Sequence, residues 1–142
     1  MSRHMARIHA MSLVFQFPFH PGWDEDTLNQ AILQYISDYM DSTPNPDDFI
    51  FIEGETFGTF THLPKIDGLI EEKLKDWELS RIAKVDLAIL RLAIYEILFA
   101  SDITTATAIN EAVELAKEYG TDESPIFING LLGAVASELS DG

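Results

Sequence analysis

The sequence contains no cysteine and no apolar run long enough to cross a membrane. Without cysteine, the chain can form neither a disulfide bond nor a thiolate metal site. A membrane-spanning helix needs about 20 consecutive apolar residues, and the N-terminal residues lack the apolar segment and cleavage site of a secretion signal. We therefore expect a cytoplasmic protein that makes no membrane contact.

Basic residues are scarce, with nine Lys and Arg against 24 Asp and Glu and a formal net charge of −15. Residues 1–23 contain Arg3 and Arg7 and no acid, whereas the rest of the chain holds seven basic and 24 acidic residues, a net charge of −17. An acidic body repels nucleic acid at long range and attracts basic partners. A solvated surface without any specific partner accounts for this acidity equally well.

The sequence also lacks the usual patterns of a catalytic centre. Its four histidines have no second histidine or carboxylate at helical ligand spacing, and no Glu-x-x-His motif of a di-iron bundle occurs. A glycine-rich phosphate loop is absent as well. These absences argue against an enzyme, and we expect no metal and no cofactor.

Apolar residues recur at helical spacing along most of the chain, and no convincing pair of strands appears. Residues 49–52 alone could form a strand, but the four-residue spacing of Ile52, Thr56 and Phe60 favours a helix. The sequence therefore predicts an all-α fold of about seven helices in a single domain, 1–142. The expected helices cover 3–17, a segment capped by Asp24, 47–60, 66–74, 85–99, a segment opened by Thr104 or Thr105, and a segment opened by Ser124.

Residues with special backbone roles mark several helix ends. Ser80 could cap the apolar helix 85–99, and Gly120 stands where a left-handed C-cap belongs. Ser124 precedes a proline, which is favoured in the first turn of a helix. In the first helix, Met5, Ile8 and Phe15 share an apolar stripe, which leaves the arginines on the opposite face.

The first helix also carries a short cationic face, made of Arg3, His4, Arg7 and His9. Such a face can bind phosphates, although a frayed basic N-terminus explains it as well. Phe127 lies near the start of the last helix, where an aromatic ring can stack on an unpaired base or pack on the preceding loop. Glycine at position 130 could permit a close approach of two helices, and Asn110 and Glu111 could hold neighbouring segments together.

Taken in order, these residues resemble the NusB family of transcription antitermination factors. The resemblance is strongest over 66–135 and resumes at 3–16, whereas 18–65 matches only as helices of suitable length. The matching motifs are Ala6-Arg7, Arg81-Ile82, Val85-Asp86, Ile89-Leu90-Arg91, Tyr95-Glu96, Ile109-Asn110-Glu111-Ala112, Glu114-Leu115-Ala116-Lys117, Gly120, Ser124 and Phe127-Ile128-Asn129-Gly130.

The resemblance implies two helical subdomains of three and four helices, at about 1–62 and 63–140. It also implies binding of boxA RNA together with NusE, a small-subunit ribosomal protein, within the elongation complex of RNA polymerase. By position, the RNA-binding residues would be Arg3, His4, Arg7, Glu123, Ser124 and Phe127. The NusE-binding residues would be Arg81 and Asp86.

The chain departs from the family pattern in its charge. His4 occupies a position in an otherwise arginine-rich cluster, and Ile126 stands where a basic residue often precedes the phenylalanine. A protein-only adaptor of the same fold, which binds NusE but not RNA, is therefore an alternative. An RNA-reading module of a methyltransferase is another, and both monomer and homodimer are open. Phe17, Phe19 and Trp23 could serve as core or as contact surface.

Overall fold

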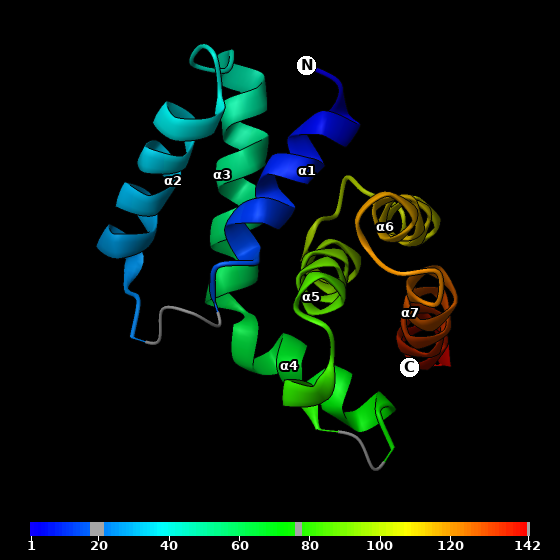
Figure 1. Ribbon diagram of the computed structural model, residues 1–142. Helices are drawn as coiled ribbons and strands as arrows, with labels where there is room; N and C mark the ends of the chain where they lie inside the picture. Colours follow the sequence, from blue (N-terminus) through cyan, green and yellow to red (C-terminus); the bar gives the residue numbers. More distant parts are fainter. Residues whose placement is uncertain (18–21, 76–77, 142) are drawn as a thin grey trace.

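The computed structural model describes residues 1–17, 22–75 and 78–141, and this part of the chain contains seven α-helices and no strand (Figure 1). The all-α prediction is therefore confirmed. The helices are α1 (Arg3–Val14), α2 (Glu25–Tyr39), α3 (Pro46–Thr61), α4 (Leu63–Lys73), α5 (Lys84–Phe99), α6 (Thr105–Tyr119) and α7 (Ser124–Asp141), with a short 3-10 helix, η2 (Leu79–Arg81), before α5.

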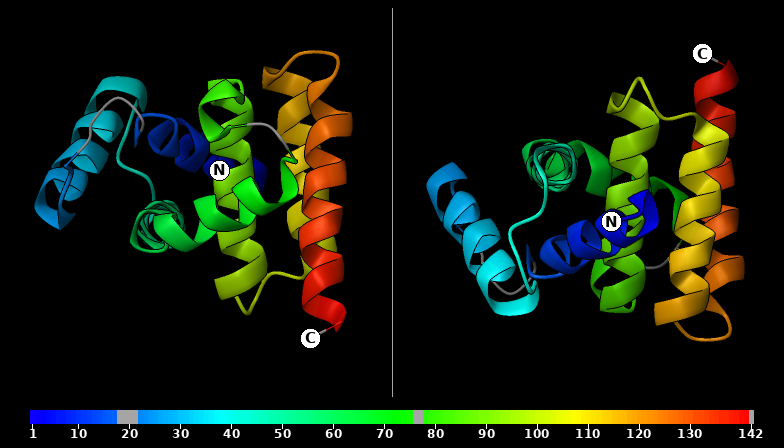
Figure 2. Two further views of the ribbon diagram at one scale, coloured as in Figure 1. Left: turned by 90° about the horizontal axis from the view of Figure 1, so that it is seen from below. Right: turned by 90° about the horizontal axis from the view of Figure 1, so that it is seen from above.

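Helix α5 forms the centre of the molecule. It contacts α1, α3, α4, α6 and α7, while α2 packs against α1 and α3. The views in Figure 2 place α2 and α7 on opposite sides, with α5 between them. Burial on nearly all sides explains why α5 is apolar around its whole circumference, as the sequence predicted.

An ion pair explains the one basic residue within the apolar run of α5. The guanidinium of buried Arg91 donates from Nε and Nη2 to the two carboxylate oxygens of Asp67 on α4, each at 2.9 Å. A paired geometry of this kind fixes orientation as well as distance. Arg91 therefore ties α4 to the central helix.

Several helix ends were predicted correctly. The Asp24 carboxylate accepts a hydrogen bond from the Thr27 amide at 2.8 Å, and the Thr104 hydroxyl accepts one from the Thr107 amide at 3.1 Å. Residues 49–52 are helical rather than a strand. Helix α3 begins slightly earlier than expected, because Asn45 caps it and Pro46 occupies its first turn.

Other predicted helix ends were wrong. Ser80 lies inside η2, and Ala83 precedes α5 without a side-chain cap. The helix expected over 66–74 begins earlier, at Leu63, and Pro64 lies in its first turn, where a proline costs no hydrogen bond. Gly120 is extended at φ −93° rather than left-handed, and Gly130 faces open space rather than a neighbouring helix.

The buried face of α1 also differs from the prediction. Met5 is exposed, whereas Ala6, Arg7, Ala10 and Leu13 are buried. Small alanines let α1 approach its neighbours closely, and the arginine belongs to the buried face instead of the outer one. After the helix, Phe17 is core and packs edge-on against Trp23; Phe19 lies outside the described residues.

A close approach between α3 and α5 depends on Gly58. A methyl group at this position would overlap the Tyr95 ring, whereas one at Gly54, on the same helix, would meet nothing. We expect Gly58→Ala to destabilise the protein by about 1–3 kcal/mol through overpacking. Gly54→Ala is the matched control and should stabilise by about 0.5–1 kcal/mol through helix propensity. Urea unfolding measures both, and equal effects would contradict this role of Gly58.

Among the described residues, no helix is both long and apolar enough to span a membrane. The division into subdomains at about 1–62 and 63–140 remains a prediction. It falls at the junction of α3 and α4, but α1 and α3 also pack directly on α5.

Candidate functional site

A cavity of about 460 Å³ lies where the start of α5 meets the α6–α7 turn. It brings together five of the residues predicted to bind RNA or NusE, which come from separate parts of the sequence. These five are Arg81, Asp86, Glu123, Ser124 and Phe127. The two predicted surfaces are thus contiguous rather than separate.

Asp86 is the most unusual member of this cavity. Its side chain lies in the first turn of α5 and is only 8% exposed, yet its Oδ1 has no hydrogen-bond partner among the described residues. A buried polar atom without a partner costs free energy. A negative charge near the N-terminus of a helix is favoured by the helix dipole. Asp86 is therefore placed to accept a hydrogen bond from a donor that enters the cavity.

Ser124 has a structural role in the α6–α7 turn. Its buried hydroxyl accepts a hydrogen bond from the Thr121 amide at 2.9 Å, so it closes the turn instead of capping α7. A side chain at Gly120 would come within 2.5 Å of the Ser124 Oγ, which explains the glycine. Ser124 therefore shapes the cavity wall and does not present a free hydroxyl.

The remaining cavity residues differ in exposure. Arg81 and Glu123 are exposed, whereas Phe127 is half-buried and packs against the core while lining the cavity. Next to it, Ile126 is 80% exposed. An apolar side chain is thus exposed to solvent beside the cavity.

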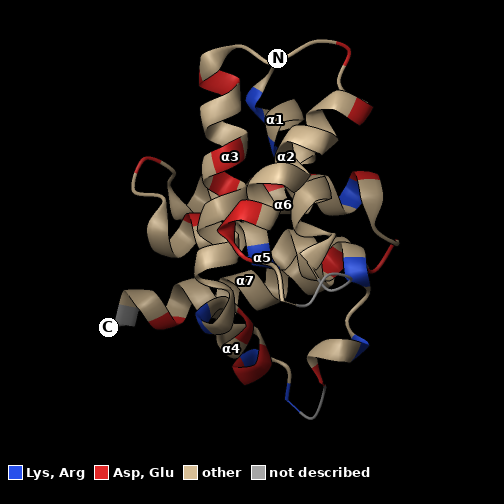
Figure 3. Ribbon diagram, turned by 90° about the vertical axis from the view of Figure 1, so that its left-hand side faces the viewer, with Lys and Arg blue, Asp and Glu red and all other residues tan. Residues whose placement is uncertain are grey.

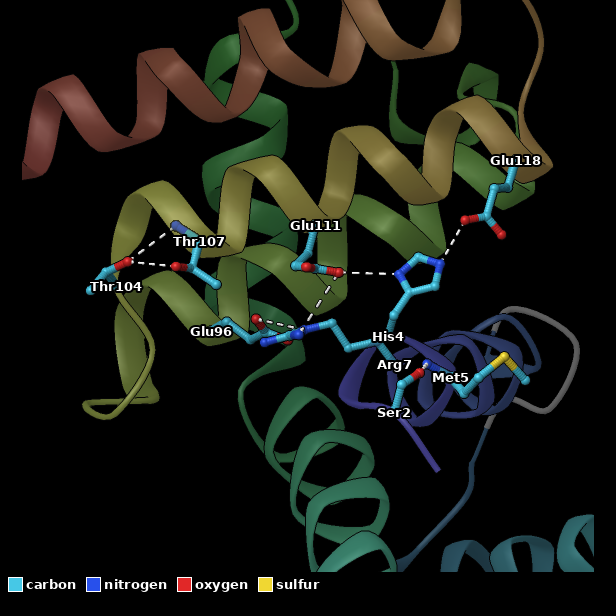
Figure 4. Close-up of polar contacts among 9 residues, drawn as sticks. All are labelled: Ser2, His4, Met5, Arg7, Glu96, Thr104, Thr107, Glu111 and Glu118. Carbon is cyan, nitrogen blue, oxygen red and sulfur yellow. Dashed lines mark hydrogen bonds and ion pairs between the residues drawn. The ribbon is translucent and has the colours of Figure 1, made fainter.

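The predicted cationic face of α1 is not a free cationic surface in the structure. Arg7 is only 5% exposed, and its Nε donates to the Glu96 carboxylate at 3.1 Å, with Glu96 itself 2% exposed (Figure 4). The prediction failed here because α1 turns its arginine toward α5. Arg7 is a core ion pair and its charge is already neutralised.

His4 lies between two carboxylates of α6, as Figure 4 shows. Its Nδ1 is 3.2 Å from Glu111 and its Nε2 is 2.6 Å from Glu118. The hydrogen bond with Glu111, followed by that with Glu118, raises the pKa of His4 above its usual value. His4 therefore joins α1 to α6, and the expectation that Glu111 holds helices together is confirmed.

Of the predicted face, Arg3 alone is exposed. Its guanidinium lies 4.2 Å from the centre of the Phe51 ring, a cation–π geometry. His9 instead contacts the Tyr35 hydroxyl at 2.8 Å, and burial lowers the pKa of His9, which disfavours its charged form. One exposed arginine therefore carries most of the positive charge that α1 offers.

No sequence pattern indicated Glu55, which the structure adds to this cluster. Glu55 is 3% exposed, and burial, followed by a hydrogen bond with Glu96, raises the pKa of Glu55 to about 10. It therefore holds its proton at neutral pH beside the Arg7–Glu96 pair. Helical spacing showed Glu55 only as a polar residue of α3, since the approach of α1 and α5 is what buries it.

The two groups of predicted residues are adjacent through the end of α6. Glu118, which contacts His4, stands one turn before Thr121, which lines the cavity. Figure 3 shows acidic positions on several helices, with basic positions interspersed among them. No group of residues suited to bind a metal ion occurs in the described part of the chain.

Comparisons with known proteins agree on one family. The model of the NusB family matches residues 4–137. The transcription antitermination protein NusB of Natranaerobius thermophilus is 43% identical over 140 residues, which cover 99% of this chain and 98% of that protein. The structure of NusB from T. maritima has a TM-score of 0.84 at 35% identity and covers 97% of this chain and 92% of that chain.

A complex of the antitermination factors NusB and NusE with double-stranded RNA contains a chain of the same fold. Its TM-score is 0.80 at 21% identity, and the match covers 97% of this chain and 99% of that chain. At this identity the likeness concerns the fold alone.

Proposed function

This chain belongs to the NusB family, and we propose that it is a cytoplasmic transcription antitermination factor that binds boxA-type RNA together with NusE. In this role the complex joins the elongation complex of RNA polymerase and suppresses termination. The single observation that carries the proposal is the family match over nearly the whole chain, with a curated relative at 43% identity.

The geometry supports a joint site for RNA and protein. The cavity at the α6–α7 turn has Asp86 and Arg81 on one side and Glu123 and Phe127 on the other. Asp86 offers an unpaired buried oxygen to a basic residue of a partner, and the half-buried ring of Phe127 is placed to contact a base. Because these groups share one cavity, each ligand would complete the surface that the other binds, which predicts cooperative binding.

Asp86 gives the proposal a specific test on the protein side. We expect Asp86→Asn to weaken NusE binding about 10- to 100-fold, because a buried charge would no longer meet its basic partner. The free energy of unfolding should change little, since Oδ1 has no hydrogen bond to lose among the described residues. Asp41→Asn, at an exposed position after α2, removes the same charge and is the control. Calorimetric titration with NusE measures both, and equal affinities would contradict the assignment.

The whole proposal is tested by mixing the protein with purified NusE and boxA RNA and resolving the products by size-exclusion chromatography. We expect a ternary complex at low salt that dissociates as salt increases, because phosphate contacts release counterions. Absence of a ternary complex at low salt would overturn the proposal.

One observation favours a second candidate, the protein-only adaptor. Arg7 is neutralised by Glu96 and His4 is placed between two carboxylates, so the chain offers little positive charge for RNA. Under this alternative NusE binds at Asp86, and all RNA contacts belong to NusE. Measurable preference of the protein alone for boxA over a scrambled oligomer would rule it out.

A further inference from the structure

A second cavity, also of about 460 Å³, lies between α3 and the α5–α6 turn. It is lined by three aromatic rings, from Phe51, Tyr95 and Phe99, and by acidic residues that include Glu55 and Asp102. The NusE and RNA residues discussed above, apart from Arg3, do not line it. Its composition therefore calls for a separate explanation.

One buried oxygen in this cavity has no partner. Glu55 Oε1 finds no hydrogen-bond partner among the described residues although the side chain is 3% exposed and lines the cavity. Native proteins satisfy nearly all of their buried polar atoms, with protein, water or ligand. The oxygen therefore indicates a hydrogen-bond donor that enters from the cavity.

The rings indicate that this donor is a cation. The faces of aromatic rings attract cations within about 6 Å of their centres, and three of the protein's own cations already occupy such positions. The guanidinium groups of Arg3 and Arg7 lie 4.2 and 5.4 Å from the centre of Phe51, and Lys65 Nζ lies 5.8 Å from the centre of Phe99. The rings are fixed in place, because Phe99 stacks on His62 with ring centres 3.7 Å apart and its ring centre lies 6.1 Å from that of Tyr95.

We propose that this cavity is a binding site for a guanidinium group. A guanidinium has only donors, which suit the unpaired Glu55 oxygen and the exposed Asp102 carboxylate, and its flat faces stack on aromatic rings. Arg3 shows that a guanidinium fits against Phe51 at the rim. The ligand is an arginine side chain of a polypeptide or a free alkylguanidine, and of the residues predicted to bind RNA or NusE only Arg3 lines the site.

Titration of the ¹⁵N-labelled protein at fixed ionic strength tests the proposal by NMR. The ligands are N-acetyl-arginine-methylamide for a side chain, agmatine for a free alkylguanidine, and N-acetyl-citrulline-methylamide as the neutral isostere. We expect saturable chemical-shift changes of the amides of Gly54 and residues 100–103 with the two guanidines. The guanidine that binds more tightly shows whether the natural ligand is an arginine side chain or a free alkylguanidine. No saturable shift there, or equal shifts with the citrulline compound, would overturn the proposal.

Variants distinguish specific binding in this cavity from general attraction of a cation to an acidic protein. We expect Asp102→Asn to weaken binding roughly threefold or more, whereas Asp122→Asn, which removes the same charge at the α6–α7 turn, should not. Equal effects of the two would overturn the proposal. Arg3→Ala removes the protein's own cation from the rim of the cavity, so this variant should bind the guanidines at least as tightly as the wild type. Weaker binding by this variant would also overturn the proposal.

Discussion

Replacing Arg7 by alanine should destabilise this protein by about 3–5 kcal/mol, the largest effect that we expect of any single substitution in α1. The guanidinium of Arg7 is the partner of Glu96, and both side chains are buried. Removing one member of a buried ion pair leaves the other charge desolvated and unpaired. Here the loss is aggravated by Glu55, a second buried acid that already interacts with Glu96.

Chemical denaturation with urea, followed by circular dichroism, measures this loss. Arg3→Ala is the matched control, since it removes an arginine from the same helix at an exposed position, and it should change the free energy of unfolding by less than about 1 kcal/mol. A similar small effect of Arg7→Ala would contradict the buried ion pair. Because of this expected loss, weakened RNA binding by the Arg7 variant would report unfolding, and Arg3 is the better probe of RNA contact.

Replacing Glu55 by glutamine should stabilise the protein at neutral and alkaline pH, by roughly 1–3 kcal/mol at pH 7. Burial raises the pKa of Glu55 to about 10 in the folded protein, from an ordinary value of 4.5. Between these two values the unfolded chain ionises Glu55 while the folded chain keeps it protonated. The unfolded state therefore gains relative stability as pH rises, and the wild type loses stability through this window.

The glutamine side chain has the shape of the protonated acid and cannot ionise, so this pH-dependent loss disappears. We expect the wild type and the variant to differ little near pH 4.5, and their difference to grow steadily toward pH 9. Urea titrations at several pH values measure the difference, with Glu53→Gln on the same helix as the control for losing one carboxylate. A difference that does not grow with pH would contradict the raised pKa of Glu55.

The fold was predictable because most of its elements follow from local patterns. The apolar circumference of α5 indicated a central helix, and the caps at Asp24 and Thr104 are local interactions that a sequence displays directly. The errors arose where contacts between elements, rather than local patterns, determine the conformation. Ser124 turned back to bond Thr121, and Gly120 is required by that contact rather than by its own φ angle.

The candidate site was predictable only in part. Family resemblance drew attention to Asp86, Glu123, Ser124 and Phe127, but spacing alone could not show that they share one cavity with Arg81. The burial of Arg7 was not predicted, because an arginine in a helix is expected to be exposed unless its buried partner is known. That partner, Glu96, is 89 positions away in the sequence, beyond the reach of any local pattern.

The central claim is that this chain and NusE bind boxA RNA jointly, and fluorescence anisotropy with a labelled RNA tests it most directly. The measured quantity is the Kd for boxA and for a scrambled oligomer, each with this protein alone, with NusE alone and with both proteins. With so little free positive charge on α1, we expect weak binding by the protein alone. With NusE, we expect the Kd for boxA to fall at least about tenfold, the size of a typical coupling between sites, with a smaller change for the scrambled RNA. Two results would contradict the account. One is an affinity of the two proteins together for boxA that is no higher than that of NusE alone, and the other is an affinity for boxA equal to that for the scrambled oligomer.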